Sequence, residues 1–151
     1  MDECGVNTYL QREYARAPRG EQIEDVKRGS KFERVNVTGA LCQREHYSIK
    51  CYKHTTEARF FENWFEECIL KETPSGCGYT IIMDNARFHR KKILRKLARG
   101  KVRLLFLPPY SPDYNPIEKT WANMKRFLRN NLQDFQSVDS AVYNYFGVSV
   151  I

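Results

Sequence analysis

The stretch YTIIMDN, residues 79–85, decides the fold class. Its apolar residues do not alternate with polar ones, which predicts a short strand buried on both faces and ending in the carboxylate of Asp84. A strongly basic segment from about Arg87 to Arg99 follows, and we expect it to form a helix that Gly100 closes. The stretch VRLLFL, which begins at Val102, predicts a second buried strand. Buried strands that alternate with helices are typical of an α/β domain.

Upstream segments add two strands and a helix to this domain. ERVNVTGAL, from Glu33, alternates valines with polar residues, and HYSIKCYK covers His46–Lys53. The short gap between these segments predicts an antiparallel hairpin. A helix follows, capped by Thr55 or Thr56 and running to about Lys71. It carries one broad apolar stripe that we assign to the core, formed by Phe60, Phe61, Trp64, Phe65, Cys68 and Ile69.

The downstream part begins with a rigid loop. LPPYSPDYNP, residues 107–116, has four prolines in ten residues, which restricts its backbone. It leads into a helix with the sequence IEKTWANMKRFLRNN, residues 117–131, and we expect a last helix over Asp134–Phe146. Strands and helices in this order predict an α/β fold with a mixed sheet flanked by helices.

Size and composition indicate one folded domain over residues 1–151. Hydrophobic residues make up 42% of the chain, and its formal net charge is +7. A basic chain favours a polyanionic partner, usually nucleic acid. No apolar run approaches the roughly 20 residues that span a bilayer, and the polar, acidic start excludes a secretory signal peptide. The five cysteines lack metal-binding spacing, so we expect reduced thiols in a cytoplasmic protein.

Three carboxylates are candidates for catalysis, and each has a structural alternative. Asp84 follows a buried strand, where open α/β sheets place their chemistry, but Asp84 or Asn85 could instead cap the next helix. Glu118 lies in the first turn of the helix that follows the rigid loop. With Asn115 as the N-cap, Glu118 would also complete a variant of the capping box, which needs no catalysis. Asp2 alone would be a solvated terminus, and it gains weight only beside the other two.

Three carboxylates brought together repel one another strongly unless cations occupy the site. Their hard oxygen ligands suit Mg²⁺ or Mn²⁺. Two such ions roughly 3.5–4 Å apart would activate a nucleophile on one side of a phosphodiester and stabilise the leaving oxygen on the other. His89, five residues after Asp84, could approach this site, although a structural hydrogen bond is its favoured role.

A continuous basic segment follows the second carboxylate. Residues 87–103 contain nine Lys or Arg and no acidic residue. A solvated helix face normally mixes both signs, so a run of one sign indicates contacts to phosphate, which position DNA without reading its sequence. The cations that we expect to contact DNA are Arg87, Arg90, Lys91, Lys92, Arg95 and Lys96, with Lys119, Lys125 and Arg126 on the helix of Glu118.

Three motifs are similar to those of a known family. DECG from Asp2, IIMDNARFH over Ile81–His89 and LFLPPYSPDYNPIEKTWANMKRFLR over Leu105–Arg129 resemble the bacterial insertion-sequence branch of the mariner-like DDE transposases. The resemblance implies an RNase H-like fold and a catalytic triad of Asp2, Asp84 and Glu118 holding two Mg²⁺ (or Mn²⁺) ions. Residues expected to support this triad are Asn85, His89 and Asn115.

The same resemblance implies cleavage of double-stranded DNA at transposon ends, followed by attack of the freed 3′-hydroxyl on target DNA, with a homodimer as the assembly on DNA. In that family the first aspartate lies inside the central strand, and helix-turn-helix domains that recognise transposon ends precede it. We therefore expect an incomplete first strand over Asp2–Tyr9, a poorly held Asp2, and little transposition activity from this chain alone.

A separately encoded N-terminal half would then supply end recognition, in a bacterial cytoplasm and at the nucleoid. The main alternative is a catalytically inactive, DNA-binding transposase relic. A general RNase H-like nuclease acting on RNA would fit the carboxylates, but it would not predict the segment SPDYNPIE, residues 111–118.

Overall fold

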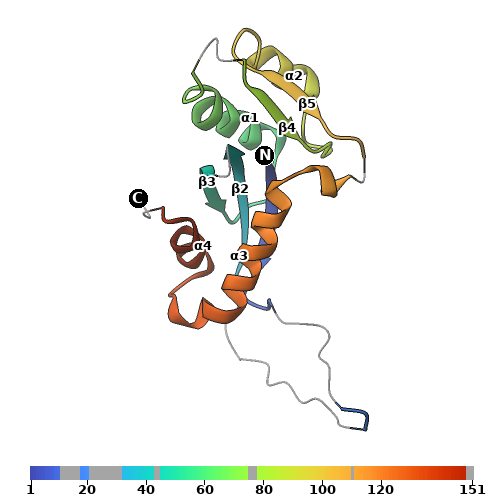
Figure 1. The fold of residues 1–151 in the computed structure, drawn as a ribbon. Helices are drawn as coiled ribbons and strands as arrows, with labels where there is room; N and C mark the ends of the chain where they lie inside the picture. Colours follow the sequence, from blue (N-terminus) through green and yellow to red (C-terminus); the bar gives the residue numbers. More distant parts are fainter. Residues whose placement is uncertain (11–17, 21–31, 43–44, 75–77, 110, 149–151) are drawn as a thin grey trace.

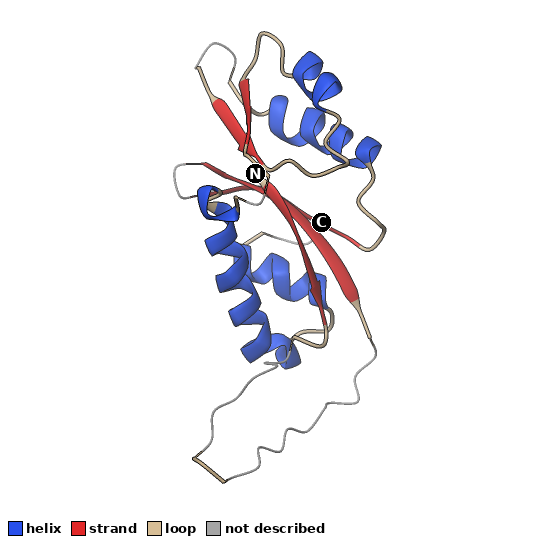
Figure 2. Ribbon diagram, turned by 90° about the vertical axis from the view of Figure 1, so that its right-hand side faces the viewer, coloured by secondary structure: helices blue, strands red, loops and turns tan. Residues whose placement is uncertain are grey.

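A computed structural model describes residues 1–10, 18–20, 32–42, 45–74, 78–109 and 111–148 of the chain. Its strands form two small sheets that run through the middle of the molecule (Figure 1). Turning the molecule by 90° places one group of helices on each side of these strands (Figure 2). The predicted α/β class is therefore confirmed, with helices flanking the strands.

The larger sheet is antiparallel and has the order β1-β2-β3, formed by β1 (Asp2–Asn7), β2 (Arg34–Cys42) and β3 (Glu45–Tyr52). β1 pairs with β2 along its whole length, with Asp2 opposite Gly39. The predicted hairpin of β2 and β3 is confirmed, with a register shift between Thr38 and Ala40. The expected short first strand also forms.

The smaller sheet is parallel and contains β4 (Thr80–Met83) and β5 (Arg103–Phe106). The mixed sheet predicted from the sequence is thus divided into an antiparallel and a parallel part. One backbone hydrogen bond joins the two, because the Met1 nitrogen donates to the Ile82 carbonyl oxygen at 2.7 Å. This bond places the start of β1 beside the end of β4.

The first helical region differs from the prediction at its start. α1 (Ala58–Trp64) continues into a π-helical segment, η1 (Phe65–Leu70), so the helix ends near the expected residue. Neither threonine caps it, because Glu57 occupies the N-cap position without a side-chain bond. The hydroxyl of Thr56 instead lies 2.7 Å from that of Tyr52.

The basic helix is shorter than predicted. α2 spans Lys91–Leu97, so Arg87 and Arg90 precede it instead of lying within it. Residues 84–90 are held by local bonds, among them that from the His89 amide to the Ala86 carbonyl at 3.1 Å. Gly100 follows the helix with a φ of 78°, the left-handed conformation that a glycine allows.

The last part of the chain is helical, as expected. A 3₁₀ turn, η2 (Pro112–Tyr114), leads into α3 (Ile117–Asn131), and a second one, η3 (Leu132–Asp134), leads to α4 (Val138–Phe146). α4 begins four residues later than predicted, because the Ser137 side chain accepts from the Ser140 amide and closes a capping box.

Two hydrophobic cores lie on the two sides of the strands. The first joins valines of β1 and β2 to α3 and α4 and includes Trp121 and Met124. The second joins α1, η1, β4 and α2 and includes Phe61, Phe65 and Met83. The apolar stripe predicted on the first helix packs in this core except for Phe60, whose ring contacts those of Tyr52 and His54. Among the described helices, none has both the length and the apolar character needed to cross a membrane.

The cysteines in the described part of the chain are free thiols, as predicted, namely Cys4, Cys42, Cys51 and Cys68. Cys77 lies outside the described residues.

Gly39 makes the close approach of α3 to β2 possible. A Cβ atom added there would lie 2.5 Å from Ile49 Cδ1 and 3.1 Å from Trp121 Cη2. We predict that Gly39→Val destabilises the fold by about 1–3 kcal/mol, because the Trp121 ring has to move. Gly5→Val is the matched control in β1, where an added Cβ has no neighbour closer than 3.6 Å. Urea unfolding of both variants measures the difference, and equal stability would contradict this packing.

Candidate active site

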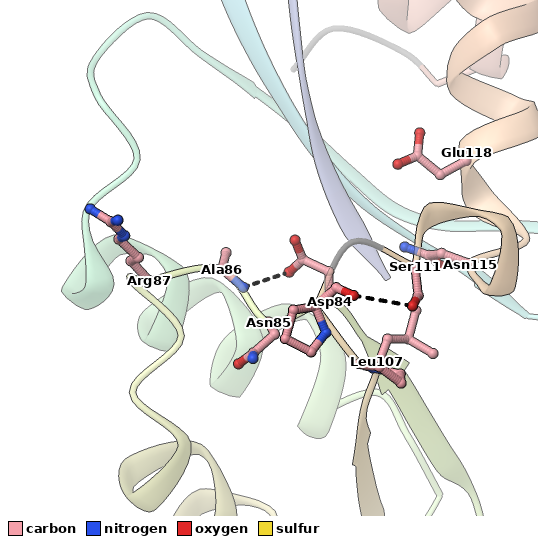
Figure 3. A pocket seen from close by; sticks show the side chains of 10 residues that line it. Asp84, Asn85, Ala86, Arg87, Leu107, Ser111, Asn115 and Glu118 are labelled. Carbon is pink, nitrogen blue, oxygen red and sulfur yellow. Dashed lines mark hydrogen bonds between the residues drawn. The ribbon is translucent and has the colours of Figure 1, made fainter.

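Asp84 lies immediately after β4, with its carboxylate in a polar turn. Its Oδ1 accepts a hydrogen bond from the Ala86 amide at 3.1 Å (Figure 3). This bond closes a local Asx-type turn. Neither Asp84 nor Asn85 caps the following helix, because α2 begins at Lys91 and its N-cap residue, Arg90, makes no side-chain cap bond. The capping alternative considered for Asp84 and Asn85 is therefore wrong.

His89 connects Asp84 to an acid that the sequence analysis did not single out, Glu3. The His89 Nδ1 lies 3.1 Å from Asp84 Oδ1, and Nε2 lies 3.4 Å from Glu3 Oε1. Burial alone would lower the pKa of His89, but its bonds and charge interactions with Asp84 and Glu3 raise that pKa to about 9. The structural hydrogen bond predicted for His89 is thus present, and its partners are two carboxylates.

The sequence contained one usable signal for Glu3. Adjacent residues of a strand point to opposite faces, so the pair Asp2-Glu3 at the start of a strand delivers one carboxylate to each face. Glu3 faces His89, and Asp2 faces Trp121 on α3.

Asp2 is buried and held by the core. Asp2 is 6% exposed to solvent, and its carboxylate Oδ2 accepts a hydrogen bond from Trp121 Nε1 at 3.2 Å. Burial is the main reason that the pKa of Asp2 rises from 3.8 to about 7, and the charges of Glu3, Glu118 and Asp84 raise it further. The expectation of a poorly held Asp2 is therefore wrong: pairing of β1 with β2 and the indole of Trp121 fix it.

Glu118 lies exposed in the first turn of α3. Its amide donates to the Asn115 carbonyl oxygen at 3.1 Å, but α3 has no side-chain cap bond. The predicted capping box is therefore wrong, and so is the prediction that Asn115 is the N-cap, a position that Pro116 occupies. Asn115 is instead a buried residue.

Asp84 and Glu118 line one cleft of about 370 Å³ (Figure 3). The wall also contains Asn85, Ala86, Arg87, Leu107, Pro108, Pro109, Ser111 and Asn115. Asp2 is not among the lining residues, yet it interacts electrostatically with both acids. The three carboxylates predicted to act together therefore lie near one another, two on the cleft wall and one buried beside it.

The donor set fits a divalent cation. Burial raises the pKa of Asp2, the neighbouring carboxylates raise it further, and a bound cation would favour its ionised form. Carboxylate oxygens are the ligands that Mg²⁺ and Mn²⁺ prefer. Ligand atoms of Glu3, Asp84 and His89 also lie within 4.8 Å of one another, although a histidine is less suited to Mg²⁺.

The predicted DNA-contacting cations fall into different environments. Arg87 lines the cleft, and the side chains of Lys92, Lys96, Lys119 and Arg126 are exposed. Arg90 instead forms a two-point ion pair with the buried Glu62, at 2.7 Å for Nε and with Nη2 on the second oxygen. Because its charge is already compensated, Arg90 is less available to phosphate than its neighbours.

Three further cations make contacts with the protein surface. Lys91 Nζ and Arg95 Cζ lie 5.1 and 5.4 Å from the centre of the Phe106 ring, as cation–π pairs. Lys125 is half-buried and lies beside the Cys4 thiol.

Comparison with known proteins gives the family. A family model described as DDE superfamily endonuclease matches residues 1–140, so the chain belongs to that family. The fold is similar to that of the Mos1 transposase paired-end complex with the left transposon end, with a TM-score of 0.65 and 18% sequence identity over 99% of this chain. The Mos1 Strand Transfer Complex gives a TM-score of 0.63 and 16% identity over the same share. The predicted RNase H-like fold and the predicted relationship to DDE enzymes are confirmed.

The two Mos1 chains are longer than this chain. It spans 48% and 46% of the two Mos1 chains. It is also 27% identical over 95 residues to the uncharacterized protein y4pE/y4sA of Sinorhizobium fredii, which covers 63% of this chain and 65% of that protein.

The burial of Asp2 predicts a pH-dependent stability. Because its folded-state pKa is about 7 against 3.8 for the free carboxyl, the contribution of Asp2 to stability is largest below pH 4 and is lost as pH rises from about 4 to 7. Asp2→Asn removes this titration and keeps an oxygen for Trp121. We predict that it stabilises the protein at pH 8 by on the order of 2 kcal/mol, with a much smaller gain at pH 4. Chemical unfolding at both pH values measures this, and a gain independent of pH would contradict it.

Proposed function

We propose that the chain is the catalytic domain of a DDE transposase, which cleaves DNA at transposon ends and joins the freed 3′-hydroxyl to target DNA. The main support for this proposal is the position of Asp84 and Glu118 on one cleft, with Asp2 buried nearby and interacting electrostatically with both. Membership of the DDE superfamily endonuclease family supports cleavage of a phosphodiester bond. The similar Mos1 structures, a paired-end complex with a transposon end and a strand transfer complex, support transposition.

In this proposal Asp2, Asp84 and Glu118 hold two Mg²⁺ or Mn²⁺ ions. When bound, the ions lower the pKa of the attacking water or 3′-hydroxyl and stabilise the leaving oxygen. The protein groups orient the reacting strand and neutralise its charge. Asp84 and Glu118 face the cleft from two elements, β4 and α3, so a scissile phosphate would lie between rigid supports.

Double-stranded DNA is the proposed partner, and the exposed cations are its proposed contacts. Arg87 at the cleft wall would contact the phosphate nearest the reaction, since it lines the same cleft as Asp84. Lys92 and Lys96 on α2, with Lys119 and Arg126 on α3, would bind phosphates further along the strand. Arg90 makes a smaller contribution because Glu62 pairs with it.

The proposal assigns residues 1–151 to one catalytic unit. In this proposal, an N-terminal DNA-binding part outside these residues recognises the specific transposon ends. A homodimer on DNA, in a bacterial cytoplasm and at the nucleoid, completes the proposed assembly.

Metal binding tests the proposed triad. We predict that Mn²⁺ binds the wild-type chain at pH 7.5 and that Asp84→Asn or Glu118→Gln weakens binding at least about 10-fold, because each removes an anionic ligand. Asp113→Asn is the matched control, since Asp113 is exposed on the turn before α3. Isothermal titration calorimetry measures the affinities. Equal affinity of Asp84→Asn and the wild type would contradict the proposed triad.

Cleavage of DNA tests the chemistry. With Mn²⁺ present, the wild-type chain should nick plasmid DNA without preference for transposon ends, because end recognition is assigned to a separate part. Asp84→Asn should reduce the nicking rate by at least about 100-fold, since the metal site supplies most of the catalysis. If wild type and variant are equally inactive while both bind DNA, the chain is the inactive DNA-binding relic instead.

Charge reversal on α2 tests whether this helix contacts DNA. We predict that the double variant Lys92→Glu/Lys96→Glu weakens binding of a duplex in 100 mM salt and reduces the slope of log K against log[salt] by about 2, one for each lost phosphate contact. Lys71→Glu is the control, because Lys71 pairs with Glu67 on the surface of η1. Fluorescence anisotropy measures both variants. An unchanged salt slope would exclude α2 from the DNA interface.

A further inference from the structure

We propose that Glu3 is a positioning residue that acts through His89 to fix the Asp84 carboxylate for cation binding. The inference rests on the proposed function of Asp84 as a metal ligand and extends it to a pair of residues outside the triad. Glu3, His89 and Asp84 form a carboxylate–imidazole–carboxylate chain from β1, the segment before α2 and the end of β4.

The distances support a continuous chain. Nδ1 of His89 lies 3.1 Å from Asp84 Oδ1 and 3.3 Å from the Asp84 carbonyl oxygen. Nε2, on the opposite side of the ring, lies 3.4 Å from Glu3 Oε1. Both ring nitrogens therefore face carboxylates, so a change at Glu3 is transmitted to Asp84 through one rigid ring.

The surroundings of His89 keep this ring in place. His89 is 4% exposed, and its ring centre lies 4.3 Å from that of Phe61 on α1. Phe88 packs against it edge-on at 4.6 Å. With the ring confined between aromatic side chains, the remaining freedom is rotation about its own axis, which the bond to Glu3 restrains.

Their positions relative to the cleft distinguish Glu3 and His89 from the proposed metal ligand, Asp84. Asp84 lines the cleft together with Glu118, whereas neither Glu3 nor His89 is among the lining residues. Glu3 also points to the side of β1 opposite to Asp2, which faces Trp121. Glu3 and His89 therefore lie behind Asp84, where hydrogen-bond partners of metal ligands commonly lie, and loss of such partners typically weakens metal binding 10- to 100-fold.

A double-mutant cycle with Mn²⁺ as the probe tests this role. Glu3→Ala should weaken Mn²⁺ binding by about 10-fold. Glu3→Gln retains an oxygen that accepts from Nε2, so it should recover part of the loss. His89→Asn keeps an amide nitrogen at the place of Nδ1 but has no group that reaches Glu3. In the His89→Asn background, Glu3→Ala should therefore have no further effect.

The measurements are calorimetric titration of Mn²⁺ and thermal unfolding of each metal-free variant. Glu66→Ala, an exposed acid on η1, is the control for loss of one negative charge. Wild-type affinity of Glu3→Ala, or equal weakening by Glu3→Ala in both backgrounds, would overturn the positioning role, the latter because Glu3 would be a direct ligand. If Glu3→Ala is too unstable to titrate, Glu3→Gln in the two backgrounds decides by the same comparison.

Failure of the proposed function gives a different result. A wild-type chain that binds no Mn²⁺, or Asp84→Asn that binds as tightly as wild type, would overturn the triad and the positioning role together. Normal wild-type binding, loss in Asp84→Asn and full binding in Glu3→Ala would overturn the positioning role alone.

Discussion

Repulsion among acidic groups gathered at the start of β1 and the end of β4 is the constraint on which the site depends. The hydrogen bond from Met1 to Ile82 holds these two strand ends together. Four carboxylates lie near that contact. Asp2 and Glu3 leave β1 on opposite faces, Asp84 ends β4, and Glu118 approaches from α3. Like charges at such short range are stable only when cations compensate them.

The protein compensates this charge differently on the two faces. On one face, the imidazole of His89 lies between Glu3 and Asp84, and its raised pKa keeps it cationic at neutral pH. On the other face, Asp2 has only the indole of Trp121 as a side-chain donor, and its pKa is raised to about 7. The Met1 amino group also interacts with Asp2, but burial lowers the pKa of that amino group, so a divalent cation would add positive charge on this face. Such a site lowers the stability of the metal-free protein and raises its affinity for a metal ion.

Much of the fold was predictable because it depends on local patterns. Alternating valines predicted β2, the uninterrupted apolar run before Asp84 predicted β4, and α3 was expected after the proline-rich loop. The errors arose where side-chain hydrogen bonds override the local pattern. α2 starts late because Asp84 and His89 organise the turn before it, although the charge pattern alone indicated a helix.

Part of the site was also predictable from local sequence motifs. Motif resemblance supplied Asp2, Asp84 and Glu118, and the structure places them near one cleft. Glu3 was missed because its partner, His89, is 86 residues away in sequence, and no local pattern reports that contact. The pairing of Arg90 with Glu62, 28 residues away, was hidden similarly inside a run of cations that looked uniform.

The most direct test of this account is the position of Mn²⁺ in crystals of the protein, located by the anomalous scattering of manganese. The account predicts anomalous peaks between Asp2, Asp84 and Glu118, with His89 still bonded to Asp84 on the opposite side. Manganese bound only at Glu3 and His89, or absent from the cleft at saturating concentration, would contradict the assignment of these three carboxylates as the metal site.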